Sequence, residues 1–499
     1  LLGGARLLYR IYFERQSNFK DYSSKILLIG AGNAGAQLIK DAIVDGRNRI
    51  QIVAIFDDNP KTHGRSIQGI TVVGPTSLIG EYASDHNVND VVIAIPSASA
   101  QQMRQLVNLC AEFKLRVKTL PAVTDLIEGK VELSNIRPIN ITDLLARDQI
   151  ELDAEQVNIL ISKKVVMVTG AGGSIGSELC AQILRHDPAK LILFETCEFF
   201  IYKTERALRE KFSHIEIVPV VGDVRDSVRV ENTLAKYRPD ILFHAAAYKH
   251  VPMMELNPEE AIKTNVGGTA IVSSLANKYK VARFVMVSSD KAVNPTNIMG
   301  ATKRVAEMLC LEQNAKGPTH FTIIRFGNVL GSAGSVIPLF QEQIRNGGPV
   351  TVTHPEVTRY FMSIPEATQL VLQACSLGNG GEIFVLEMGK PVKIADLAKD
   401  LIRLSGFEPE IDIRIEYTGL RPGEKLYEEL LTDNEHTSAT SHNLVRRALL
   451  QKNPENFNML LDRLIGSVNE EKHIKNILRE LVPEYKIYQN EQGHENSKS

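Results

Sequence analysis

Runs of apolar residues separated by polar or glycine-rich turns recur along the chain and fall into two series. The first series lies at 25–30, 50–56, 90–95 and 116–120, with a helical pattern over 36–44. The second lies at 164–170, 190–194, 218–223, 241–247 and 284–287, with a helical stretch over 261–277. Short apolar runs that alternate with helices are typical of parallel sheets buried on both faces. The pattern therefore predicts an α/β protein with two successive parallel-sheet domains.

A glycine-rich turn connects the first strand and helix of each series. The turns are Gly30-Ala-Gly-Asn-Ala-Gly35 and Gly170-Ala-Gly-Gly-Ser-Ile-Gly176. Glycine lets the backbone turn tightly and approach a pyrophosphate, which then lies at the helix N-terminus. The next strand ends in Asp57-Asp58 in the first series and in Glu195 in the second, where an acid can bind an adenosine ribose and favours NAD over NADP. We predict two Rossmann-like, doubly wound domains.

The predicted domain bounds follow from these patterns. Residues 21–135 form an N-terminal Rossmann-like nucleotide-binding domain, 136–160 a polar connector with one amphipathic turn, 161–485 the second domain, and 486–499 a disordered tail. Residues 1–20 place Arg6, Arg10 and Arg15 among apolar residues. That arrangement fits the juxtamembrane linker of a truncated membrane anchor, and an amphipathic helix explains it equally well.

Composition narrows the class of protein. Apolar residues make up 43% and charged residues 23%, as in ordinary soluble domains. With 57 basic and 59 acidic residues the net charge is −2, so no bulk charge favours a nucleic-acid partner. The five scattered cysteines lack metal-ligand spacing and are typical of reduced thiols, so we predict no metal site. No apolar run approaches the length of a membrane span.

The most reactive stretch is predicted at 288–303. It follows the strand at 284–287, so Ser289, Asp290 and Lys291 should emerge at the carboxyl edge of the sheet. An adjacent acid and amine can divide proton donation and abstraction between them, as an elimination requires. Met299 and Lys303 stand at i and i+4 on the helix expected after Pro295. The alternative is an ordinary strand-turn-helix with solvated charges.

The Met299 and Lys303 spacing resembles the Tyr-x-x-x-Lys pair of the extended short-chain dehydrogenase/reductase family. A thioether cannot give or take a proton, so the tyrosine's task should fall to Ser289, Asp290 or Lys291. Five motifs in order carry the wider resemblance: Thr169–Gly176, Ala245–Pro252, Ser289–Arg304, Arg325–Gly331 and Arg421–Lys425. Together they resemble the nucleoside-diphosphate-sugar 4,6-dehydratases. The chain is most similar to the large, membrane-anchored UDP-N-acetylglucosamine 4,6-dehydratases of bacterial polysaccharide and protein-glycosylation pathways.

The resemblance implies a hydro-lyase with tightly held NAD. Carbon 4 of the sugar is oxidised, water is lost across carbons 5 and 6, and a hydride returns to carbon 6, with retention at carbon 5 favoured. Asp290 would protonate the departing hydroxyl, Lys291 would take the carbon-5 proton, and Lys303 would bind the nicotinamide ribose. Met299 replaces the family's usual tyrosine, and we predict Ser289 as the proton relay in its place.

The resemblance and the strand-end pattern also name binding residues. The predicted cofactor residues are Gly170, Gly173, Ser174, Ile175, Gly176, Glu195, Asp223, Val224, Ala245, Ala246 and Lys303. The predicted substrate residues are Lys249, Asn265, Arg325, Asn328, Arg359, Arg421 and Glu424, the last ordering its loop. Guanidinium groups suit a pyrophosphate. A smaller C-terminal part of the second domain should bind the substrate.

The resemblance further implies attachment to the cytoplasmic face of the bacterial inner membrane, with this fragment itself soluble. It also implies a homo-oligomer, with residues 261–277 and 299–314 as candidate pairing helices. Two alternatives stay open. One is a UDP-sugar 4-epimerase or reductase, which relies on the tyrosine that is absent here. The other is an inactive nucleotide-sugar sensor, which Met299 and the additional N-terminal domain suggest.

Overall fold

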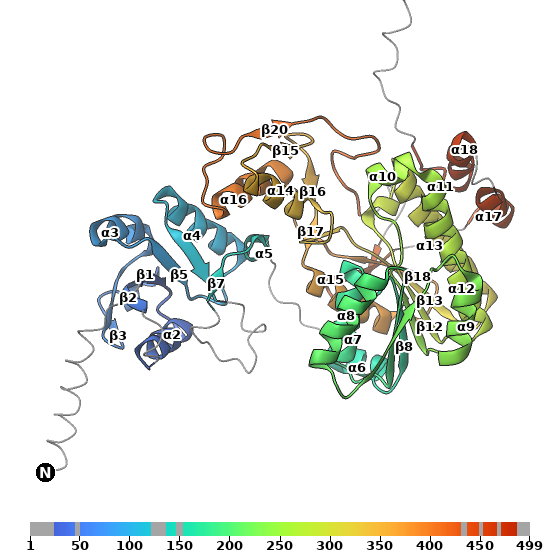
Figure 1. Cartoon of the computed structure of the whole chain (residues 1–499), viewed down its shortest axis with the longest axis horizontal. Coiled ribbons are helices and arrows are strands. Elements are labelled where there is room, and N and C mark those ends of the chain that lie inside the picture. The colour runs from blue at the N-terminus through green and yellow to red at the C-terminus, as the bar shows by residue number, and fades with distance from the viewer. Residues whose placement is uncertain are drawn as a thin grey trace, which may run out of the picture. The chain divides into compact units, whose positions relative to one another are not determined.

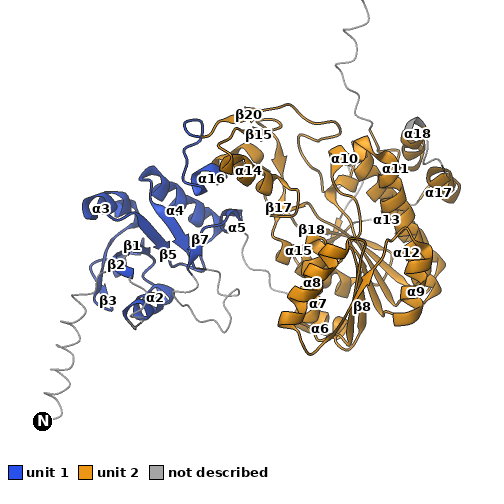
Figure 2. Cartoon of the chain, in the orientation of Figure 1, with its two compact units in different colours: residues 1–148, 400–412 blue, residues 149–399, 413–499 orange. Residues whose placement is uncertain are grey.

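The protein is described from a computed structural model. The structure describes residues 24–44, 50–120, 136–145, 153–430, 437–448, 453–466 and 471–486. Figure 2 colours two compact units: unit 1 comprises residues 1–148 and 400–412, and unit 2 comprises residues 149–399 and 413–499. The linker predicted at 1–20 and the tail predicted at 486–499, apart from its first residue, lie outside the described residues. Among the described residues, no helix is long and apolar enough to cross a membrane.

Unit 1 is built on one mostly parallel sheet with strand order β3-β4-β2-β1-β5-β6-β7. Its strands are β1 (Ser24–Ile29), β2 (Ile50–Phe56), β3 (Ser66–Ile67), β4 (Ile70–Gly74), β5 (Asp90–Ile93), β6 (Arg116–Thr119) and β7 (Arg137–Pro138). Its helices are α2 (Asn33–Val44), α3 (Ile79–His86), α4 (Ala100–Glu112) and α5 (Ile141–Leu145), with 3-10 turns at Pro60–Thr62 and Thr76–Leu78. The predicted strands β1, β2, β5 and β6 are confirmed as parallel neighbours.

Unit 2 contains a larger sheet with strand order β10-β9-β8-β11-β12-β13-β18-β22-β21. Its strands are β8 (Val165–Thr169), β9 (Lys190–Glu195), β10 (Glu216–Val221), β11 (Ile241–His244), β12 (Arg283–Val287), β13 (His320–Arg325), β18 (Glu382–Leu386), β21 (Thr437–Ala439) and β22 (Val445–Ala448). The strands are parallel except at the β21 and β22 edge. The strand order reverses between β8 and β11, and such a switch point is where doubly wound sheets bind ligands.

Helices cover both faces of this sheet (Figure 1). On one face lie α6 (Ala154–Ile161), α7 (Ser174–Leu184), α8 (Glu198–Lys211) and α15 (Ile364–Leu377), which pack on inward residues such as Val166 and Val168. On the other lie α9 (Ser227–Tyr237), α12 (Thr269–Lys278) and α13 (Ile298–Lys316), which pack on residues such as Met167. Because both faces are buried, the middle of each central strand is mostly apolar, and the predicted fold class is confirmed.

The described part of the predicted connector, residues 136–160, contains more than the one amphipathic turn that the sequence predicted. Its described residues form β7 and α5 in unit 1 and α6 in unit 2. Val157 and Ile161 of α6 are fully buried in the core of unit 2. These residues are apolar at helical spacing, so their burial against α7 and α15 turns a predicted linker into part of the second domain.

Smaller elements surround the carboxyl edge of the large sheet. They are α10 (Val251–Leu256), α11 (Pro258–Ala261), a π-helical segment (Ile262–Gly268), a 3-10 turn (Asp290–Ala292), α14 (Val336–Arg345) and α16 (Ile394–Leu404). Three two-stranded sheets pair β14 (Asn328–Val329) with β17 (Phe361–Met362), β15 (Val350–Val352) with β20 (Ile415–Tyr417), and β16 (Thr358–Arg359) with β19 (Val392–Lys393). The later pieces, from β14 to β20, form the smaller C-terminal part of unit 2, except that residues 400–404 of α16 belong to unit 1.

The C-terminal helices α17 (Phe457–Gly466) and α18 (Glu471–Leu481) pack over α13 and the π-helical segment. Phe457, Leu460 and Leu478 share one buried cluster with Val305 and Leu309 of α13. The sequence predicted 299–314 as a pairing helix. The apolar residues of α13 in this cluster pack on helices of the same chain, because the amphipathic C-terminal helices need an apolar surface, and pairing through 299–314 stays a prediction.

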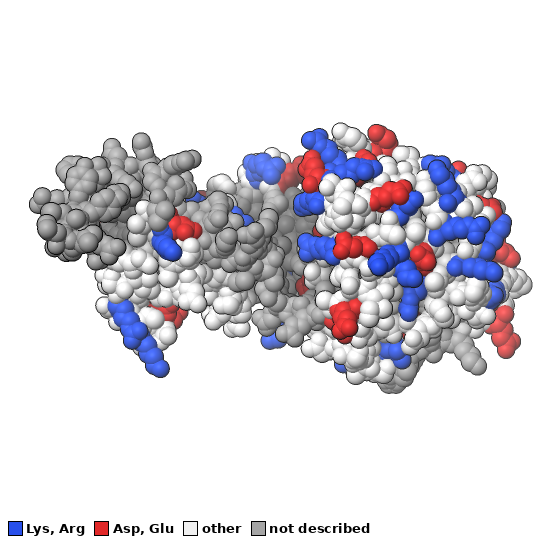
Figure 3. All heavy atoms as spheres, turned by 90° about the horizontal axis from the view of Figure 1, so that it is seen from below, with Lys and Arg blue, Asp and Glu red and all other residues white. Residues whose placement is uncertain are grey.

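Figure 3 shows how charged side chains are distributed over one face of the molecule. Acidic side chains lie among the basic ones, several of which stand together at the right of the view. This distribution agrees with the net charge of −2. It offers no continuous basic stripe on that face of the kind that a nucleic-acid backbone requires.

Candidate active site

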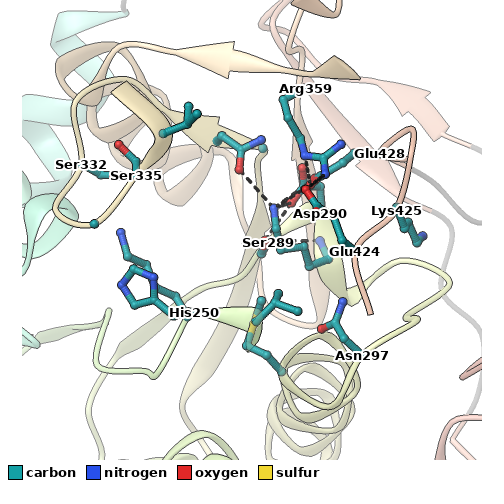
Figure 4. A pocket seen from close by; sticks show the side chains of 18 of the residues that line it. His250, Ser289, Asp290, Asn297, Ser332, Ser335, Arg359, Glu424, Lys425 and Glu428 are labelled. Atoms are coloured by element: carbon teal, nitrogen blue, oxygen red, sulfur yellow. Dashed lines mark hydrogen bonds and ion pairs between the residues drawn. The ribbon is translucent and has the colours of Figure 1, made fainter. Parts of the chain in front are cut away.

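A pocket of about 490 Å3 opens at the carboxyl edge of the large sheet in unit 2 (Figure 4). It brings together residues that lie far apart in the sequence. The predicted residues that line it are Ile175, Ala245, Lys249, Ser289, Asp290, Lys291, Met299, Lys303, Asn328, Arg359, Arg421 and Glu424. Both the Gly-rich loop region and the C-terminal part of unit 2 therefore contribute to one cavity.

The turn after β12 places the acid and the amine inside this pocket. Ser288 N and Asp290 N donate to the carbonyl oxygens of Ile324 and Phe326, which extends the pairing with β13 past the strand end. The Ser289 hydroxyl accepts a hydrogen bond from Lys291 N (3.3 Å) and donates to Asp290 Oδ1 (2.8 Å). Lys291 Nζ lies 3.1 Å from the same oxygen. Asp290 is buried, so these residues are not the solvated charges of an ordinary turn.

Glu428 completes the charged cluster, and the sequence analysis missed it. Its carboxylate lies 3.0 Å from Lys291 Nζ and 3.1 Å from Arg359 Nε. Figure 4 shows Asp290, Glu428 and Arg359 pointing toward one another. The only local signal was an acid three residues after the Arg421–Lys425 motif, and such a position does not reveal which strand end the acid will reach.

Burial and mutual repulsion make the pKa values of the two acids of the cluster differ. Burial first, and then the charge of Glu428, raise the pKa of Asp290 to about 8. Burial also acts to raise the pKa of Glu428, but Lys291, Asp290 and Arg359 together hold that pKa well below its usual range. Burial acts to lower the pKa of Lys291, and Asp290 and Glu428 outweigh it, so the pKa of Lys291 is raised.

The helix that carries Met299 and Lys303 begins as predicted after Pro295. The side chain of Asn297 caps α13 by accepting a hydrogen bond from Gly300 N (2.7 Å). Lys303 Nζ donates to Val287 O (2.7 Å), and burial lowers the pKa of Lys303 to about 8. Met299 is buried and lines the pocket with Lys303, so the predicted i and i+4 pair shares one face.

The glycine loop before α7 forms a cradle that fits a dinucleotide. Gly170 has φ +68°, and a side-chain carbon there would lie 2.7 Å from Ala246 N, so only glycine fits between β8 and β11. A side-chain carbon at Gly176 would collide with the carbonyl oxygen of Gly170. Ser174, Ile175 and Gly176 form the first turn of α7, where the N–H groups have no helical acceptor and suit the binding of an anion.

The predicted ribose and adenine contacts have different surroundings. Glu195 ends β9, and its Oε2 accepts a hydrogen bond from Gly172 N (3.0 Å) in the loop, so it lies beside the cradle as predicted for a ribose ligand. Asp223 follows β10, but Arg225 engages both of its carboxylate oxygens (2.9 Å and 2.6 Å). Val224 is buried. An adenine contact by Asp223 stays a prediction.

Two predicted substrate residues lie outside the pocket and require correction. Arg325 is fully buried, and its Nε and Nη2 bind Glu307 at 2.8 Å and 2.7 Å. Asn265 is also buried and bonds with Tyr248 N, Tyr248 O and Thr302 Oγ1. Arg325 thus joins β13 to α13, and Asn265 joins the Tyr248 loop to α13. A motif gives a residue's place in the chain but not the direction in which its side chain points.

The remaining substrate residues contact charged neighbours in the pocket. Arg359 binds Glu424 (3.0 Å) and Glu428, and its Nη1 donates to Thr358 O (2.7 Å). Arg421 binds Glu424 (3.2 Å), and its side chain is 56% exposed. Glu424 thus joins both arginines, as expected for a residue that orders its loop. Arg359 is largely committed to acids of the chain, so Arg421 is the freer guanidinium.

Asn328 and Lys249 also face the reactive cluster. Asn328 Oδ1 accepts a hydrogen bond from Lys291 Nζ (3.2 Å), a role that the sequence did not predict. Burial, and then the charge of Lys291, lower the pKa of Lys249. Two lysines, Lys249 and Lys291, therefore lie close enough in the pocket to repel each other.

A second cavity, of about 620 Å3, lies in unit 1 over its own glycine loop. Asp57 Oδ2 accepts a hydrogen bond from Ala31 N (2.7 Å) in that loop. Asp58 Oδ1 accepts from Thr76 N and Thr76 Oγ1, both at 2.8 Å. Asp57 and Asp58 are the only charged residues among the described residues that line this cavity. The described residues that line it include no acid and base in contact of the kind seen in unit 2.

Comparison with known proteins places unit 2 in a family. The profile described as "Polysaccharide biosynthesis protein" matches residues 166–450, and one described as "CoA-binding domain" matches residues 1–121. The chain therefore belongs to the polysaccharide biosynthesis protein family.

Individual relatives agree with this assignment. The chain is 44% identical over 95% of its length, and 80% of the relative's, to a protein named "Capsular polysaccharide biosynthesis protein CapD" from Staphylococcus aureus. It is 38% identical to a UDP-glucose 4-epimerase from Rickettsia canadensis over 55% of this chain and 80% of that one. The solved structure of Pen from Bacillus thuringiensis is 36% identical and has a TM-score of 0.53, covering 57% of this chain and 89% of that one.

Proposed function

We propose that the protein is a hydro-lyase that performs the NAD-dependent 4,6-dehydration of UDP-N-acetylglucosamine. The product would be UDP-2-acetamido-2,6-dideoxy-4-keto-hexose, with retention at carbon 5, which feeds bacterial glycan or protein-glycosylation pathways. The observation that carries this proposal is the buried contact of Asp290 Oδ1 with Lys291 Nζ at 3.1 Å. An acid and an amine held together in a pocket suit an elimination, in which one proton is given and another taken.

The glycine loop and its neighbours would hold the cofactor. NAD, when bound, supplies the hydride acceptor for carbon 4 and the hydride donor for carbon 6. The first turn of α7 would bind its pyrophosphate and Glu195 its adenosine ribose. Lys303 lies in the pocket near Ser289 and Asp290, and it would bind the nicotinamide ribose and add positive potential.

Oxidation of carbon 4 releases a hydroxyl proton, and Met299 cannot accept it. We assign the transfer to Ser289, whose hydroxyl takes the substrate's proton while it passes its own to Asp290 Oδ1 over 2.8 Å. Asp290 leaves this step as a carboxylic acid. A pKa raised toward neutrality suits a group that must first accept a proton and then donate it.

Elimination then uses the proton on Asp290. Lys291, in its amine form, takes the proton from carbon 5, which the 4-ketone has made acidic. That electron pair forms the bond between carbons 5 and 6, the carbon–oxygen bond at carbon 6 breaks, and Asp290 protonates the oxygen, which leaves as water. Protonation of Asp290 removes one charge that holds Lys291 as an ammonium, so the amine form becomes more accessible. As a hydride returns to carbon 6, Lys291 gives carbon 5 a proton that has exchanged with solvent, so carbon 5 gains deuterium in deuterated water.

The substrate's diphosphate would lie among the cations of the pocket. Lys249 and Arg421 line it from two different loops. The pKa of Lys249 is lowered by burial and by Lys291, and an anionic ligand would relieve that repulsion. A guanidinium such as Arg421 can bind two phosphate oxygens at once.

A UDP-sugar 4-epimerase is the second candidate, because a relative that is 38% identical carries that name. An epimerase returns the hydride to carbon 4 and never forms a methyl group at carbon 6. The absence of tyrosine at Met299 and the presence of the Asp290 and Lys291 pair favour the dehydratase. An inactive sensor would give neither product.

Proton NMR of the purified protein with UDP-N-acetylglucosamine in deuterated water separates these candidates. The dehydratase gives a new methyl signal at carbon 6 and deuterium at carbon 5, and the coupling constants report the configuration. A change of the carbon-4 configuration without a methyl signal would establish the epimerase. An unchanged spectrum with NAD supplied would favour the sensor.

For unit 1 we propose a nucleotide ligand whose ribose carries no phosphate. The cavity lies over a glycine loop, and its described lining includes Asp57 and Asp58 but no lysine or arginine. Two carboxylates would repel a ribose phosphate, such as the one that coenzyme A carries. Gly32 lines the cavity, and a side-chain carbon there meets no atom within 4 Å, so Gly32→Val should fold and still block the ligand.

Equilibrium dialysis with labelled ADP-ribose and labelled coenzyme A tests this second proposal on protein whose unit 2 is filled with NAD. We expect ADP-ribose to bind the parent protein and not the Gly32→Val variant. Preferential binding of coenzyme A would contradict the proposal. Attachment to the inner membrane and self-association stay predictions of the family resemblance.

A further inference from the structure

The loop that carries the Arg421–Lys425 motif is attached to the start of helix α13 through one of its carbonyl groups. Gly423 O accepts hydrogen bonds from Thr296 Oγ1 (2.9 Å) and from Asn297 Nδ2 (3.1 Å). Gly423 and Asn297 are buried, and Thr296 is half-buried. The two donors therefore fix one point of the loop against the N-terminal turn of α13.

The backbone of the loop lies so close to α13 that only glycine fits at this contact. Gly423 has φ +74°, and a side-chain carbon there would lie 2.7 Å from Asn297 Cβ. A second contact extends the attachment, since Lys425 Nζ donates a hydrogen bond to Val293 O (2.9 Å). The loop thus follows the turn before α13 over several residues.

Hydrogen bonds within the loop connect this attachment to Arg421. Glu424 N donates to Arg421 O (2.9 Å), and Arg421 N and Nε both donate to Glu424 Oε2 (3.1 Å and 3.2 Å). Glu424 Oε1 also accepts a hydrogen bond from Arg359 Nη2 (3.0 Å). Residues 421–424 are therefore a closed turn with two points of attachment, the Gly423 carbonyl and the Glu424 carboxylate. A shift at Gly423 would move Arg421 with it.

The two donors differ in what else they do. Asn297 uses both atoms of its amide, because Oδ1 caps α13 by accepting a hydrogen bond from Gly300 N (2.7 Å) while Nδ2 holds the loop. The Thr296 hydroxyl binds Gly423 O, and Thr296 is not among the described residues that line the pocket. Loss of the Thr296 hydroxyl would therefore reach a ligand in the pocket through the loop.

We propose that Thr296 and Asn297 are positioning residues that hold Arg421 where it can bind the diphosphate of the sugar nucleotide. This inference rests on the proposed function, which assigns the diphosphate to Lys249 and Arg421. The Arg421 side chain is 56% exposed, so its position depends on its loop more than on surrounding packing. A guanidinium binds two phosphate oxygens only when both are aligned with its N–H groups, and a small shift of the loop would lose one of them.

The test measures UDP binding to the full chain by isothermal titration calorimetry, together with KM and kcat for formation of the methyl product. Thr296→Val replaces one donor with a methyl group of similar size. Asn297→Ser removes the other donor and keeps a residue type that caps helices well. The matched control is Thr440→Val, which removes a hydroxyl that donates to Val445 O (2.6 Å), and neither of these two residues lines the pocket.

Each variant should bind UDP about 5-fold more weakly, because one hydrogen bond that positions the loop is lost, and the double variant should bind UDP more weakly still. KM for the sugar nucleotide should rise in parallel, and kcat should stay within about 2-fold of the parent value, because the reactive cluster is intact. Thr440→Val should bind UDP like the parent. A fall in kcat and thermal stability with unchanged UDP affinity would mean a merely structural role and overturn the inference.

The UDP titration separates this inference from the dehydratase proposal itself. If the parent binds UDP but forms no methyl product, weaker UDP binding in both variants would still support the positioning role, and only the assigned reaction would fail. If both variants form the methyl product with the parent's UDP affinity and KM, the positioning role is refuted and the reaction stands. A parent chain that does not bind UDP would overturn both.

Discussion

Units 1 and 2 build the same loop from the same parts, yet only one of them surrounds it with reactive groups. Each loop begins at a glycine of positive φ, +110° at Gly30 and +68° at Gly170. Each has a later glycine, Gly35 or Gly176, whose side-chain carbon would collide with the carbonyl oxygen of the first. In each, an acid at the end of the second strand, Asp57 or Glu195, accepts a hydrogen bond from a loop N–H.

The difference lies in what faces the loop across the cavity. In unit 1, Asp57 and Asp58 bind N–H and hydroxyl groups of their own neighbourhood, and their charges are satisfied locally. In unit 2, Asp290, Lys291 and Glu428 are buried against one another, and their pKa values move apart. A nucleotide-type loop thus supports binding in both units, whereas chemistry needs charges whose partners are each other.

The largest expected effect comes from removing the amine of the reactive cluster. Lys291→Ala should lower formation of the methyl product by about 10²–10⁴-fold, because the base for carbon 5 is lost, while the cofactor stays bound. Proton NMR measures the product and absorbance the bound cofactor. Gly32→Val, in the cavity of unit 1, should keep normal turnover. Normal turnover by Lys291→Ala would contradict the assignment of Lys291 as the base, and with it the claim that the charged cluster of unit 2 carries the reaction.

The second prediction compares the same substitution in the glycine loops of the two units. Gly176→Val and Gly35→Val introduce the same collision, and overpacking of this kind typically costs about 1–3 kcal/mol locally. Gly176→Val should lose the co-purified cofactor and turnover, because α7 moves away from the loop. Gly35→Val should lose ligand binding in unit 1 and keep turnover. Equal loss of turnover in both variants would show that the reaction depends on unit 1.

The third prediction concerns the correction at Arg325. Arg325→Met leaves Glu307 charged and buried without its main partner, and breaking such a pair costs about 3–5 kcal/mol of unfolding free energy. Denaturant unfolding measures this loss, and the KM for the sugar nucleotide should stay near normal in the folded fraction. The control, Arg421→Ala, removes an exposed side chain, so it should raise KM and change stability by less than about 0.5 kcal/mol. If Arg325→Met instead raised KM with little loss of stability, Arg325 would be a substrate-binding residue.

The smallest expected effect is at Met299, inside the pocket of unit 2. Met299→Leu conserves volume and should cost less than about 1.5 kcal/mol, with turnover close to normal, because the thioether moves no proton. Thermal unfolding and the NMR assay measure the two quantities. A large loss of turnover with unchanged stability would mean that the sulfur has a part in the reaction that Ser289 and Asp290 do not cover.

Local patterns predicted the parts of the site that lie next to one another in sequence. Asp290 and Lys291 follow a buried strand directly, so the direction of that strand already places them at the carboxyl edge. Met299 and Lys303 share a helix face because of their spacing alone. Arg325 shows the limit: its motif located the strand end, but its side chain turned away from the pocket to neutralise Glu307.

The sequence by itself determined the two nucleotide-type folds, their glycine loops and the acid–amine pair, because each depends on periodicity and backbone geometry over a few residues. Only the tertiary structure decided that Glu428 meets Lys291, that Arg359 is held by two acids, and that α17 and α18 pack on α13. These outcomes depend on which distant side chains are buried together. Burial sets the pKa values of these groups and the free-energy cost of an unpaired charge. The spacing of residues along the sequence does not predict which distant groups are buried together.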